Sequence, residues 1–388
     1  MVILSWKVGV LFSKTGVTSV IEKTQLNATL LAIREINSNG GVNGRFIKPI
    51  VYDPQSNPEN FRKLAKRLIT KDSANIIFGC YMSSTRKAVL PIVENHNGLL
   101  WYPTLYEGFE YSKNVIYTGA VPNQNSMFLA RYLMNQYGNR FYFVGSNYIY
   151  PYETNRIMKD ILQSKGGKVV AEKYLPLDAT KRDIDPILVD ILEKRPNVIF
   201  STIVGSATSK FYKSYWNAGL QPSQMPIASL TTSEAEVTAM GKEVGVGHVT
   251  ASPYFETVKT PSNYEFVKKY KAMFGTSSCT NACAEAAYFQ VHLFANVLRR
   301  IGTLDTDIVR TATIGTIFDA PQGTIQIDPD NNHTYLWPKI ARVNELGKFE
   351  IVAETDVPVK PDPYLVDLGS DKSLSRMKYF ESDILKAS

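Results

Sequence analysis

The stretch NIIFGCYMSSTRKAVLPIVENHNGLLWYPTLY (residues 75–106) decides the fold class. It opens with an apolar run at 75–78, continues with a segment of helical character at 84–95, and returns to an apolar run at 98–101. A strand, helix, strand order is typical of parallel sheets, because two parallel strands need a crossover connection that is usually a helix. The small polar and aromatic residues at 79–87 are therefore expected where a strand ends and a helix begins.

The same alternation continues along most of the chain. Apolar runs and helical periods take turns up to about residue 230, which indicates α/β lobes with parallel sheets covered by helices on both faces. Further strands are predicted near 6–12, 46–53, 140–145, 168–174, 197–203 and 226–229, and short ones near 323–327 and 348–352. Helices are predicted near 13–38, 58–69, 124–137, 153–165, 182–193, 206–218, 261–274 and 283–301. This succession suits two doubly wound lobes better than one barrel.

One helix can be derived residue by residue. Asn57 is a favourable N-cap residue, and Pro58 follows it at the first helical position. Apolar residues then recur at helical spacing, and they are Phe61, Leu64, Ala65, Leu68 and Ile69. This spacing predicts a helix with one buried stripe.

Residues 371–388 are predicted to form a separate C-terminal tail. Leu374, Met377 and Ile384 stand at roughly helical spacing there. The spacing predicts a terminal helix that either docks on the protein or binds a partner.

The composition is that of a globular protein large enough for two domains. Of the 388 residues, 44% are hydrophobic and 20% are charged. The 43 basic and 36 acidic residues leave a net charge of +7 without a run of like charges, so no direct nucleic-acid contact is predicted. No stretch approaches the roughly 18 consecutive apolar residues of a membrane span, so no membrane insertion is predicted.

The N-terminal residues bear on the cellular location. They lack the basic, apolar and small-residue segments of an export signal. A cytoplasmic location is predicted if Met1 is the native first residue. A periplasmic location is predicted if the natural protein carries a signal peptide before it.

Residues for metal or catalytic chemistry do not form recognisable patterns. The cysteines (Cys80, Cys279, Cys283) and the histidines (His96, His248, His292, His333) are spaced unlike metal ligands, so the thiols are predicted to be core or surface residues and no cofactor or metal is expected. The glycine motifs of dinucleotide, phosphate and nucleophile-elbow sites are absent. The chain is therefore predicted not to be an enzyme, with a small-amide hydrolase kept as a remote alternative.

The same types of residue follow several of the predicted strands. Ligands of parallel α/β sheets bind beyond the carboxyl ends of the strands. Aromatic and hydroxyl residues follow five of these ends, at 81–85, 102–106, 145–150, 201–205 and 230–234. Such a lining predicts a small pocket for a neutral polar ligand. A carboxylate ligand would normally meet an arginine, and Arg86 with Lys87 is expected one turn into the helix, facing outward.

At this point a family resemblance can be named. The blocks that carry it are GCYMSSTRKAVLP (79–91), YPTLYEGFEYSKNVIYTGAVPNQNS (102–126), GSNYIYPYETN (145–155), PIASLTTSEAEV (226–237), AEAAY (284–288), DAPQGTIQIDPDNNH (319–333) and KPDPY (360–364). Over nearly its full length the chain resembles the type I periplasmic binding proteins, and within them the amide- and urea-binding branch. The resemblance implies two lobes joined by a three-crossover hinge that closes over a ligand.

The resemblance also implies boundaries and ligand contacts. The first lobe would hold residues 1–120 and 255–325, and the second residues 121–254 and 326–370. The implied ligand-binding residues are Tyr81, Ser83, Tyr102, Thr104 and Leu105 in the first lobe and Tyr148, Tyr150, Thr202, Val204 and Thr231 in the second. The Ser83 hydroxyl and backbone amide would meet the amide carbonyl, Thr104 would bond the amide nitrogen, and the tyrosines would enclose a short alkyl tail.

Within the branch, two residue pairs favour the amide sensors that regulate aliphatic amidase operons over urea-uptake proteins. These pairs are Tyr81-Met82 and Thr104-Leu105, although the sensors carry proline where Leu105 stands. A sensor role implies an RNA-binding antiterminator protein as partner. The alternative role is uptake of short-chain amides or urea, with an ABC permease as partner. The resemblance leaves the choice between amide and urea, and homodimerisation, open.

Overall fold

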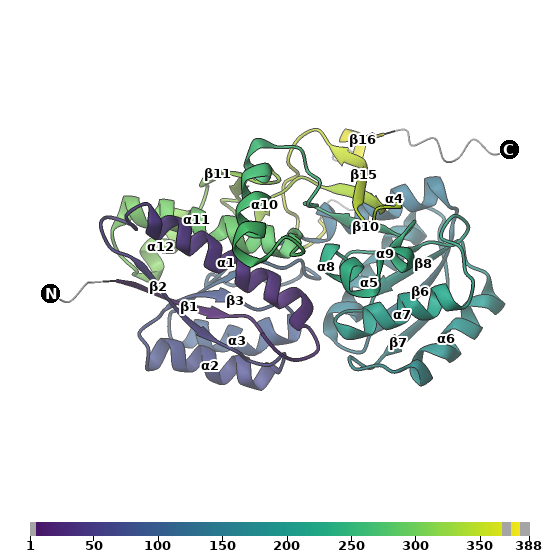
Figure 1. Cartoon of the computed structure of the whole chain (residues 1–388), viewed down its shortest axis with the longest axis horizontal. Helices are drawn as coiled ribbons and strands as arrows, with labels where there is room; N and C mark the ends of the chain where they lie inside the picture. The colour runs from purple at the N-terminus through teal and green to yellow at the C-terminus, as the bar shows by residue number, and fades with distance from the viewer. Residues whose placement is uncertain (1–4, 367–373, 381–388) are drawn as a thin grey trace. The chain divides into compact units, whose positions relative to one another are not determined.

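The computed structural model describes residues 5–366 and 374–380, which divide into two compact units. The first unit runs to Ala120 and includes Lys259–Tyr335. The second consists of Val121–Val258 and the chain from Leu336 onward. Both are layered α/β structures built on parallel strands, which confirms the predicted fold class (Figure 1).

Two crossings between the units come later than the predicted boundaries at 254/255 and 325/326. Residues 255–258 stay with the second unit, because Phe255 packs on Phe349 and the Thr257 hydroxyl donates to the Phe349 carbonyl at 2.7 Å. Residues 326–335 stay with the first unit, because Gln326 and Ile327 pair with an antiparallel strand that ends at Tyr335. Local pairing, which the sequence alone does not show, sets both boundaries.

The first unit is built on a parallel sheet with strand order β2-β1-β3-β4-β5. Its strands are β1 (Trp6–Leu11), β2 (Ile47–Tyr52), β3 (Ile76–Gly79), β4 (Leu99–Tyr102) and β5 (Val115–Tyr117). Its helices are α1 (Ser19–Ser38), α2 (Pro58–Thr70), α3 (Ser83–Asn95), α10 (Pro261–Phe274), α11 (Ala282–Ile301) and α12 (Thr306–Thr313). A small antiparallel sheet adds β11 (Ile317–Ala320), β12 (Gly323–Ile327) and β13 (Thr334–Tyr335).

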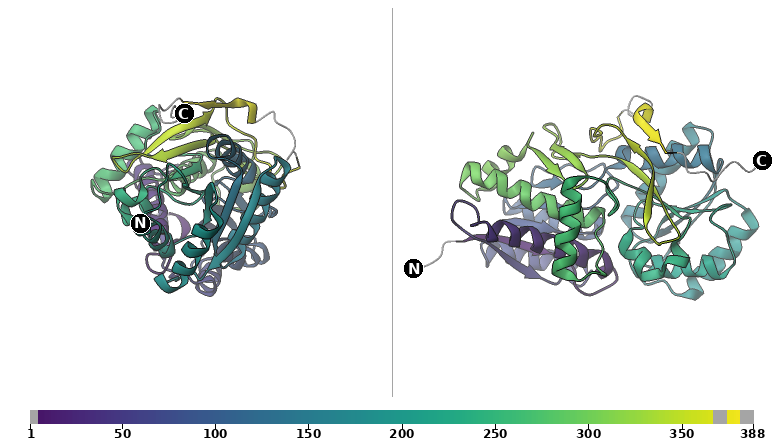
Figure 2. Two further views of the ribbon diagram at one scale, coloured as in Figure 1. Left: turned by 90° about the vertical axis from the view of Figure 1, so that its right-hand side faces the viewer. Right: turned by 45° about the horizontal axis from the view of Figure 1, so that its top comes forward.

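Helices cover both faces of this parallel sheet. In Figures 1 and 2, α1 and α11 run side by side over one face, while α2 and α3 pack together on the other. Every residue of β3, β4 and β5 is buried, which is why these strands are continuous apolar runs in the sequence. The third of them, β5, was not predicted because it is only the three residues Val115–Tyr117.

The helix derived from residues 57–69 forms as expected. The Asn57 side chain accepts a hydrogen bond from the Asn60 backbone N–H at 3.1 Å, and Pro58 opens α2. Phe61, Ala65 and Leu68 are buried. The cap satisfies one of the N–H groups that a helix start leaves without an internal partner.

The second unit is built on a mixed sheet with strand order β16-β15-β14-β10-β9-β8-β6-β7. Its parallel strands are β6 (Arg140–Ser146), β7 (Lys168–Leu175), β8 (Val198–Thr202), β9 (Ile227–Ser229) and β10 (Val249–Ser252). The antiparallel strands are β14 (Lys339–Val343), β15 (Phe349–Thr355) and β16 (Met377–Tyr379). Its helices are η1 (Pro122–Gln124), α4 (Ser126–Gln136), α5 (Ile149–Ser164), α6 (Lys181–Lys194), α7 (Ser206–Asn217), α8 (Glu234–Met240) and α9 (Lys242–Gly245).

Alternation along β6 distributes its side chains between two helical layers. Tyr142 and Val144 join the core that contains α6 and α7. Successive side chains of a strand point to opposite faces, so Phe141 and Phe143 face the other side of the sheet. All four side chains are fully buried, so this strand contributes to the core on both faces of the sheet.

The predicted terminal helix is wrong for the part of the tail that the structure describes. Residues 374–376 form a short 3₁₀ turn, and Met377–Tyr379 is strand β16, paired antiparallel with β15. Pairing with an available sheet edge outweighs the weak helical spacing. Ile384, on which that spacing also depended, lies outside the described residues.

We expect the Asn57→Ala variant to lower the free energy of unfolding by about 1 kcal/mol, because the first turn of α2 loses its cap. Urea denaturation followed by circular dichroism measures the change. Asn57→Ser keeps a capping oxygen and serves as the matched control. Equal stability of Asn57→Ala and wild type would contradict the assigned cap.

Candidate functional site

The turn between β3 and α3 is shaped by two small residues. A side-chain carbon on Gly79 would lie 2.6 Å from the Leu11 carbonyl oxygen, so only glycine fits there. Cys80 follows in a left-handed conformation (φ 73°), and its N–H donates to Leu11 O at 3.0 Å. Burial, and after it the nearby Glu22 carboxylate, raises the pKa of the Cys80 thiol. Cys80 therefore packs in the turn and is a poor nucleophile.

A buried ion cluster lies at the start of α3. The Arg86 guanidinium bonds Glu110 through Nε (2.7 Å) and Glu107 through Nη2 (3.1 Å), and it lies over the rings of Tyr102 and Tyr106. The Ser83 hydroxyl donates to Glu107 Oε2 at 2.5 Å and accepts from Arg86 Nη1 at 3.2 Å. This cluster fixes both ends of the first helical turn.

The expectation that Arg86 faces outward is wrong. Its side chain is fully buried, whereas the side chain of Lys87 is 46% exposed. Since α3 begins at Ser83, position 86 falls on the same face as Ser83. A buried guanidinium needs compensation, and the loop after β4 supplies it with Glu107 and Glu110.

The charges of this cluster balance. Arg86 and Lys87 face Glu107 and Glu110, and Lys87 Nζ lies 3.0 Å from Glu110 Oε2. Burial alone would raise the pKa of Glu110, but Arg86 and Lys87 outweigh it and lower that pKa. The cluster thus offers no surplus positive charge to a ligand carboxylate.

The hydroxyls after β4 are engaged in the same region. The Thr104 hydroxyl accepts from Gln25 Nε2 (2.9 Å) and donates to the Cys80 carbonyl (3.3 Å). The Tyr102 hydroxyl donates to the Tyr81 carbonyl at 2.7 Å. These bonds bring Tyr81, Tyr102 and Thr104 together at the carboxyl ends of β3 and β4, and Leu105 beside Thr104 is half-buried.

Two buried polar side chains of α1 belong to this neighbourhood and were missed from the sequence. Gln25 contacts Thr104, while Glu22 accepts from the Ser13 N–H (2.6 Å) and the Thr18 hydroxyl (2.5 Å). Burial outweighs these bonds and raises the pKa of Glu22 to about 7. The signal that could have found them is a polar residue on the apolar face of a helix, next to Ile21 and Leu26.

The second predicted set lies in the second unit, after neighbouring strands β6, β8 and β9. The Thr202 hydroxyl donates to Asn155 Oδ1 (3.0 Å), and the Thr231 hydroxyl donates to the Ile203 carbonyl (3.2 Å). The Val204 N–H donates to Ser146 Oγ at 3.1 Å. These residues hold the strand ends to one another.

The two predicted tyrosines of the second unit open helix α5. Their ring centroids lie 6.3 Å apart. Tyr148 is half-buried in an extended conformation before the helix, and Tyr150 is buried within its first turn. The helix thus begins at Ile149, before the predicted start at residue 153, and Pro151 is tolerated because it lies in the first turn.

The four histidines form hydrogen bonds with residues outside the predicted site set. His96 bonds the Ile92 carbonyl, and His292 bonds Glu35. Burial lowers the pKa of His248 to about 3 and that of His333 to about 4. His248 accepts from the Ile227 N–H, and His333 bonds Tyr106. The proton of the Ser83 hydroxyl is directed at a carboxylate, so these histidines are not placed to activate Ser83 as a nucleophile.

Within the described parts of the chain, no group of three or more His, Cys, Asp or Glu side chains could hold a metal ion. No helix in residues 5–366 or 374–380 combines the length and the apolar character needed to cross a membrane.

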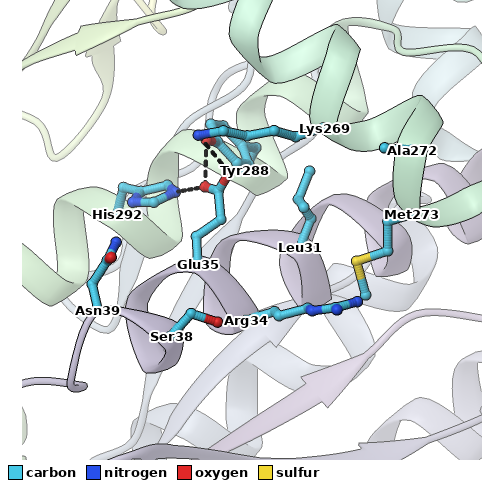
Figure 3. Close-up of a pocket in the computed structure, with 10 residues that line it drawn as sticks. All are labelled: Leu31, Arg34, Glu35, Ser38, Asn39, Lys269, Ala272, Met273, Tyr288 and His292. Carbon is cyan, nitrogen blue, oxygen red and sulfur yellow. Dashed lines mark hydrogen bonds and ion pairs between the residues drawn. The ribbon is translucent and has the colours of Figure 1, made fainter.

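A separate groove of about 580 Å³ lies among helices α1, α10 and α11 of the first unit. Its lining residues are Leu31, Arg34, Glu35, Ser38, Asn39, Lys269, Ala272, Met273, Tyr288 and His292, and none of them is a predicted site residue. Figure 3 shows Glu35 at its centre, bonded to Tyr288 Oη (2.6 Å), His292 Nε2 (3.0 Å) and Lys269 Nζ (3.0 Å). The carboxylate joins the three helices, so we assign it a structural role.

The comparisons with known proteins decide the family. The model of the periplasmic binding protein domain matches residues 6–369. The chain belongs to the periplasmic binding protein family. The Leu/Ile/Val-binding protein homolog 6 of Brucella abortus (strain 2308) is 25% identical over 286 residues, which cover 72% of this chain and 73% of that protein.

Solved structures of periplasmic binding proteins agree with this fold. A solute-binding protein of an ABC transporter from Rhodopseudomonas palustris BisB5, in complex with 3,4-dihydroxybenzoic acid, has a TM-score of 0.83 at 24% identity and covers 92% of this chain and 99% of its own. A branched-chain amino acid transporter substrate-binding protein from Streptococcus pneumoniae, in complex with isoleucine, has a TM-score of 0.79 at 18% identity, with 90% and 99% coverage. These names refer to amino acids and aromatic acids, so the comparisons support the wider family and leave the amide branch as a hypothesis.

We expect Glu35→Gln to lower the free energy of unfolding at neutral pH by about 1–3 kcal/mol, because a half-buried carboxylate that accepts hydrogen bonds, one of them from the Lys269 ammonium, is lost. Burial would raise the pKa of Glu35, but the bonds from His292, Tyr288 and Lys269 hold it at about 2, below its ordinary value of 4.5. The stabilisation is therefore present above pH 4.5 and lost as the pH falls towards 2.

Urea unfolding at a series of pH values tests this expectation. The wild type should lose more stability than Glu35→Gln over that acidic interval. Glu59→Gln removes an exposed partner of Arg62 and is the matched control, with a smaller effect at neutral pH. Parallel pH profiles of the wild type and Glu35→Gln would refute the role of Glu35.

Proposed function

We propose that this protein is the solute-binding component of an ABC transporter and that its solute is a small neutral amide or urea. The family match over residues 6–369 supports a binding role. The relatives described above are named as binding proteins, and two of them as transporter components, which supports uptake. The ligand class rests on the first unit alone.

The charge balance at the start of α3 carries the ligand proposal. A free carboxylate is usually met by an arginine or an unopposed helix start. Here Arg86 is compensated by Glu107 and Glu110 within hydrogen-bond distance. A neutral ligand needs no surplus charge and suits this environment better than an acid does.

The polar groups of the same turn suit an amide or urea. Met82, the N-cap residue of α3, forms no side-chain cap, and N–H groups of a first helical turn are donors for a carbonyl oxygen. The hydroxyl oxygens of Ser83 and Thr104 are polar partners for ligand N–H groups. A site that bonds both halves of an amide rejects analogues that leave one half unpaired.

The resemblance favoured regulation of amidase expression over uptake. The relatives favour the reverse order, because they are named as binding proteins and two of them as parts of transporters. We therefore propose an ABC permease as the partner and do not extend the antiterminator hypothesis.

We expect calorimetric titration to detect binding of at least one of acetamide, butyramide and urea, and weaker binding of leucine and benzoate. The reason is the compensated arginine at the start of α3. Incubation with acetamide should release no ammonia. The absence of a binding signal with all three neutral ligands would refute the proposed ligand class.

We expect the double variant Ser83→Ala/Thr104→Ala to weaken binding of the preferred neutral ligand by at least about 1 kcal/mol, because two hydrogen-bonding oxygens are lost. The same titration measures the change. Ser84→Ala removes a neighbouring, half-buried hydroxyl and is the matched control. If the double variant binds as tightly as this control, the ligand contacts other residues.

A further inference from the structure

Hydrogen bonds within the first unit set the direction of the hydroxyl protons of Ser83, Tyr102 and Thr104. Ser83 has one proton, which it gives to Glu107 Oε2, and its oxygen also accepts from Arg86 Nη1. A serine hydroxyl has one donor and two acceptor positions. One acceptor position is then left on Ser83 Oγ, and no donor.

The Thr104 hydroxyl also both donates and accepts a hydrogen bond within the protein. Its proton goes to the Cys80 carbonyl, and its oxygen accepts from Gln25 Nε2. The orientation of the Gln25 amide is fixed because Nε2 also donates to the Pro103 carbonyl at 3.3 Å, a bond that the amide oxygen cannot make. The Tyr102 hydroxyl likewise donates its proton to the Tyr81 carbonyl.

Gln25 adds a second, independent observation. Its side chain is fully buried, and its Oε1 atom has no hydrogen-bond partner among the residues that the structure describes. A buried acceptor without a partner costs free energy, and a bound donor would remove that cost. The side chains of Ser83 and Gln25 therefore present acceptors, and a group that binds them must bring N–H or O–H donors.

We propose that Glu107, held by Arg86, is a specificity-determining residue that fixes the Ser83 hydroxyl as an acceptor, so that the first unit selects ligands with N–H donors and rejects carboxylates. The inference rests on the proposed function and deepens it. It also changes the role first assigned to Ser83. The Ser83 oxygen meets the ligand nitrogen, and backbone N–H groups of the first turn of α3 meet the ligand carbonyl.

The fold provides the reason for two carboxylates beside one arginine. Glu110 bonds Arg86 through both of its oxygens (2.7 and 3.3 Å) and also meets Lys87. Glu107 bonds Arg86 through one oxygen and uses the other for Ser83. Glu110 thus balances charge and accepts the Tyr117 hydroxyl proton at 3.1 Å, while Glu107 is the one of the two that accepts the proton of Ser83. The two residues form a matched pair for experiment.

The test compares Glu107→Gln with Glu110→Gln in calorimetric titrations with acetamide and acetate, and with urea. Each variant removes one negative charge from the same cluster. A glutamine at 107 can donate to Ser83 Oγ and release the serine proton towards the ligand. We expect the ratio of acetate to acetamide dissociation constants to fall about tenfold in Glu107→Gln, and clearly less in Glu110→Gln. Equal changes in both variants would mean that charge alone acts and would overturn the inference.

A double-mutant cycle separates the effect of the Ser83 hydroxyl proton from the effect of the lost charge. In a Ser83→Ala background, the Glu107→Gln substitution should change the ratio of acetate to acetamide dissociation constants by no more than about twofold. The reason is that alanine has no hydroxyl proton that the substitution could reorient. A shift as large as in the Ser83 background would overturn the inference. If the wild type binds none of acetamide, butyramide and urea, the proposed ligand class fails, and neutron diffraction still tests the inference.

Neutron diffraction from crystals of the unliganded, perdeuterated wild type tests the proton directly. We expect a deuteron on Ser83 Oγ, directed at Glu107 Oε2. A deuteron that points elsewhere would overturn the inference whatever the ligand is. This measurement also keeps the inference testable if the Glu107→Gln variant does not fold.

Discussion

A fully buried arginine is the constraint on which the first unit depends. An uncompensated guanidinium in that position would be strongly destabilising, so the loop after β4 must bring two carboxylates to Arg86. Gly108 (φ 77°) and Phe109 (φ 56°) adopt the left-handed conformation between them. The shape of this loop thus follows from the charge that it has to neutralise.

The same cluster connects segments that are far apart in the sequence. Tyr117 of β5 donates to Glu110 Oε1 at 3.1 Å, and its ring stacks on His333 with centroids 4.2 Å apart. His333 also bonds Tyr106, which lies against Arg86. An ion pair, an aromatic stack and a helix start therefore form one connected network within the first unit, and such a network suits a region that must hold hydroxyls in one orientation.

Much of the fold was predictable because the signals are local. The α2 helix needed only the Asn57 cap, Pro58 and a period of apolar residues. The strand ends were predictable because parallel strands place their carboxyl ends at one edge. Arg86 was misjudged because its environment depends on Glu107 and Glu110, which are more than twenty positions away. The contact of Gln25 with Thr104 and the pairing of strand β16 were missed for the same reason, since contacts between distant segments decide them. Glu22 bonds nearby residues, and it was missed because a polar residue on an apolar helix face was not followed up.

Neither unit is continuous in the chain, and this affects the order in which a newly made protein can fold. The sheet of the first unit is complete when β5 emerges from the ribosome, yet α11 (Ala282–Ile301), which lies along α1, is made only after the parallel strands of the second unit. The second unit in turn waits for β14 and β15. Both nascent sheets therefore keep apolar surface exposed until the last third of translation, and exposed apolar surface of this kind is what makes unfinished domains prone to aggregation.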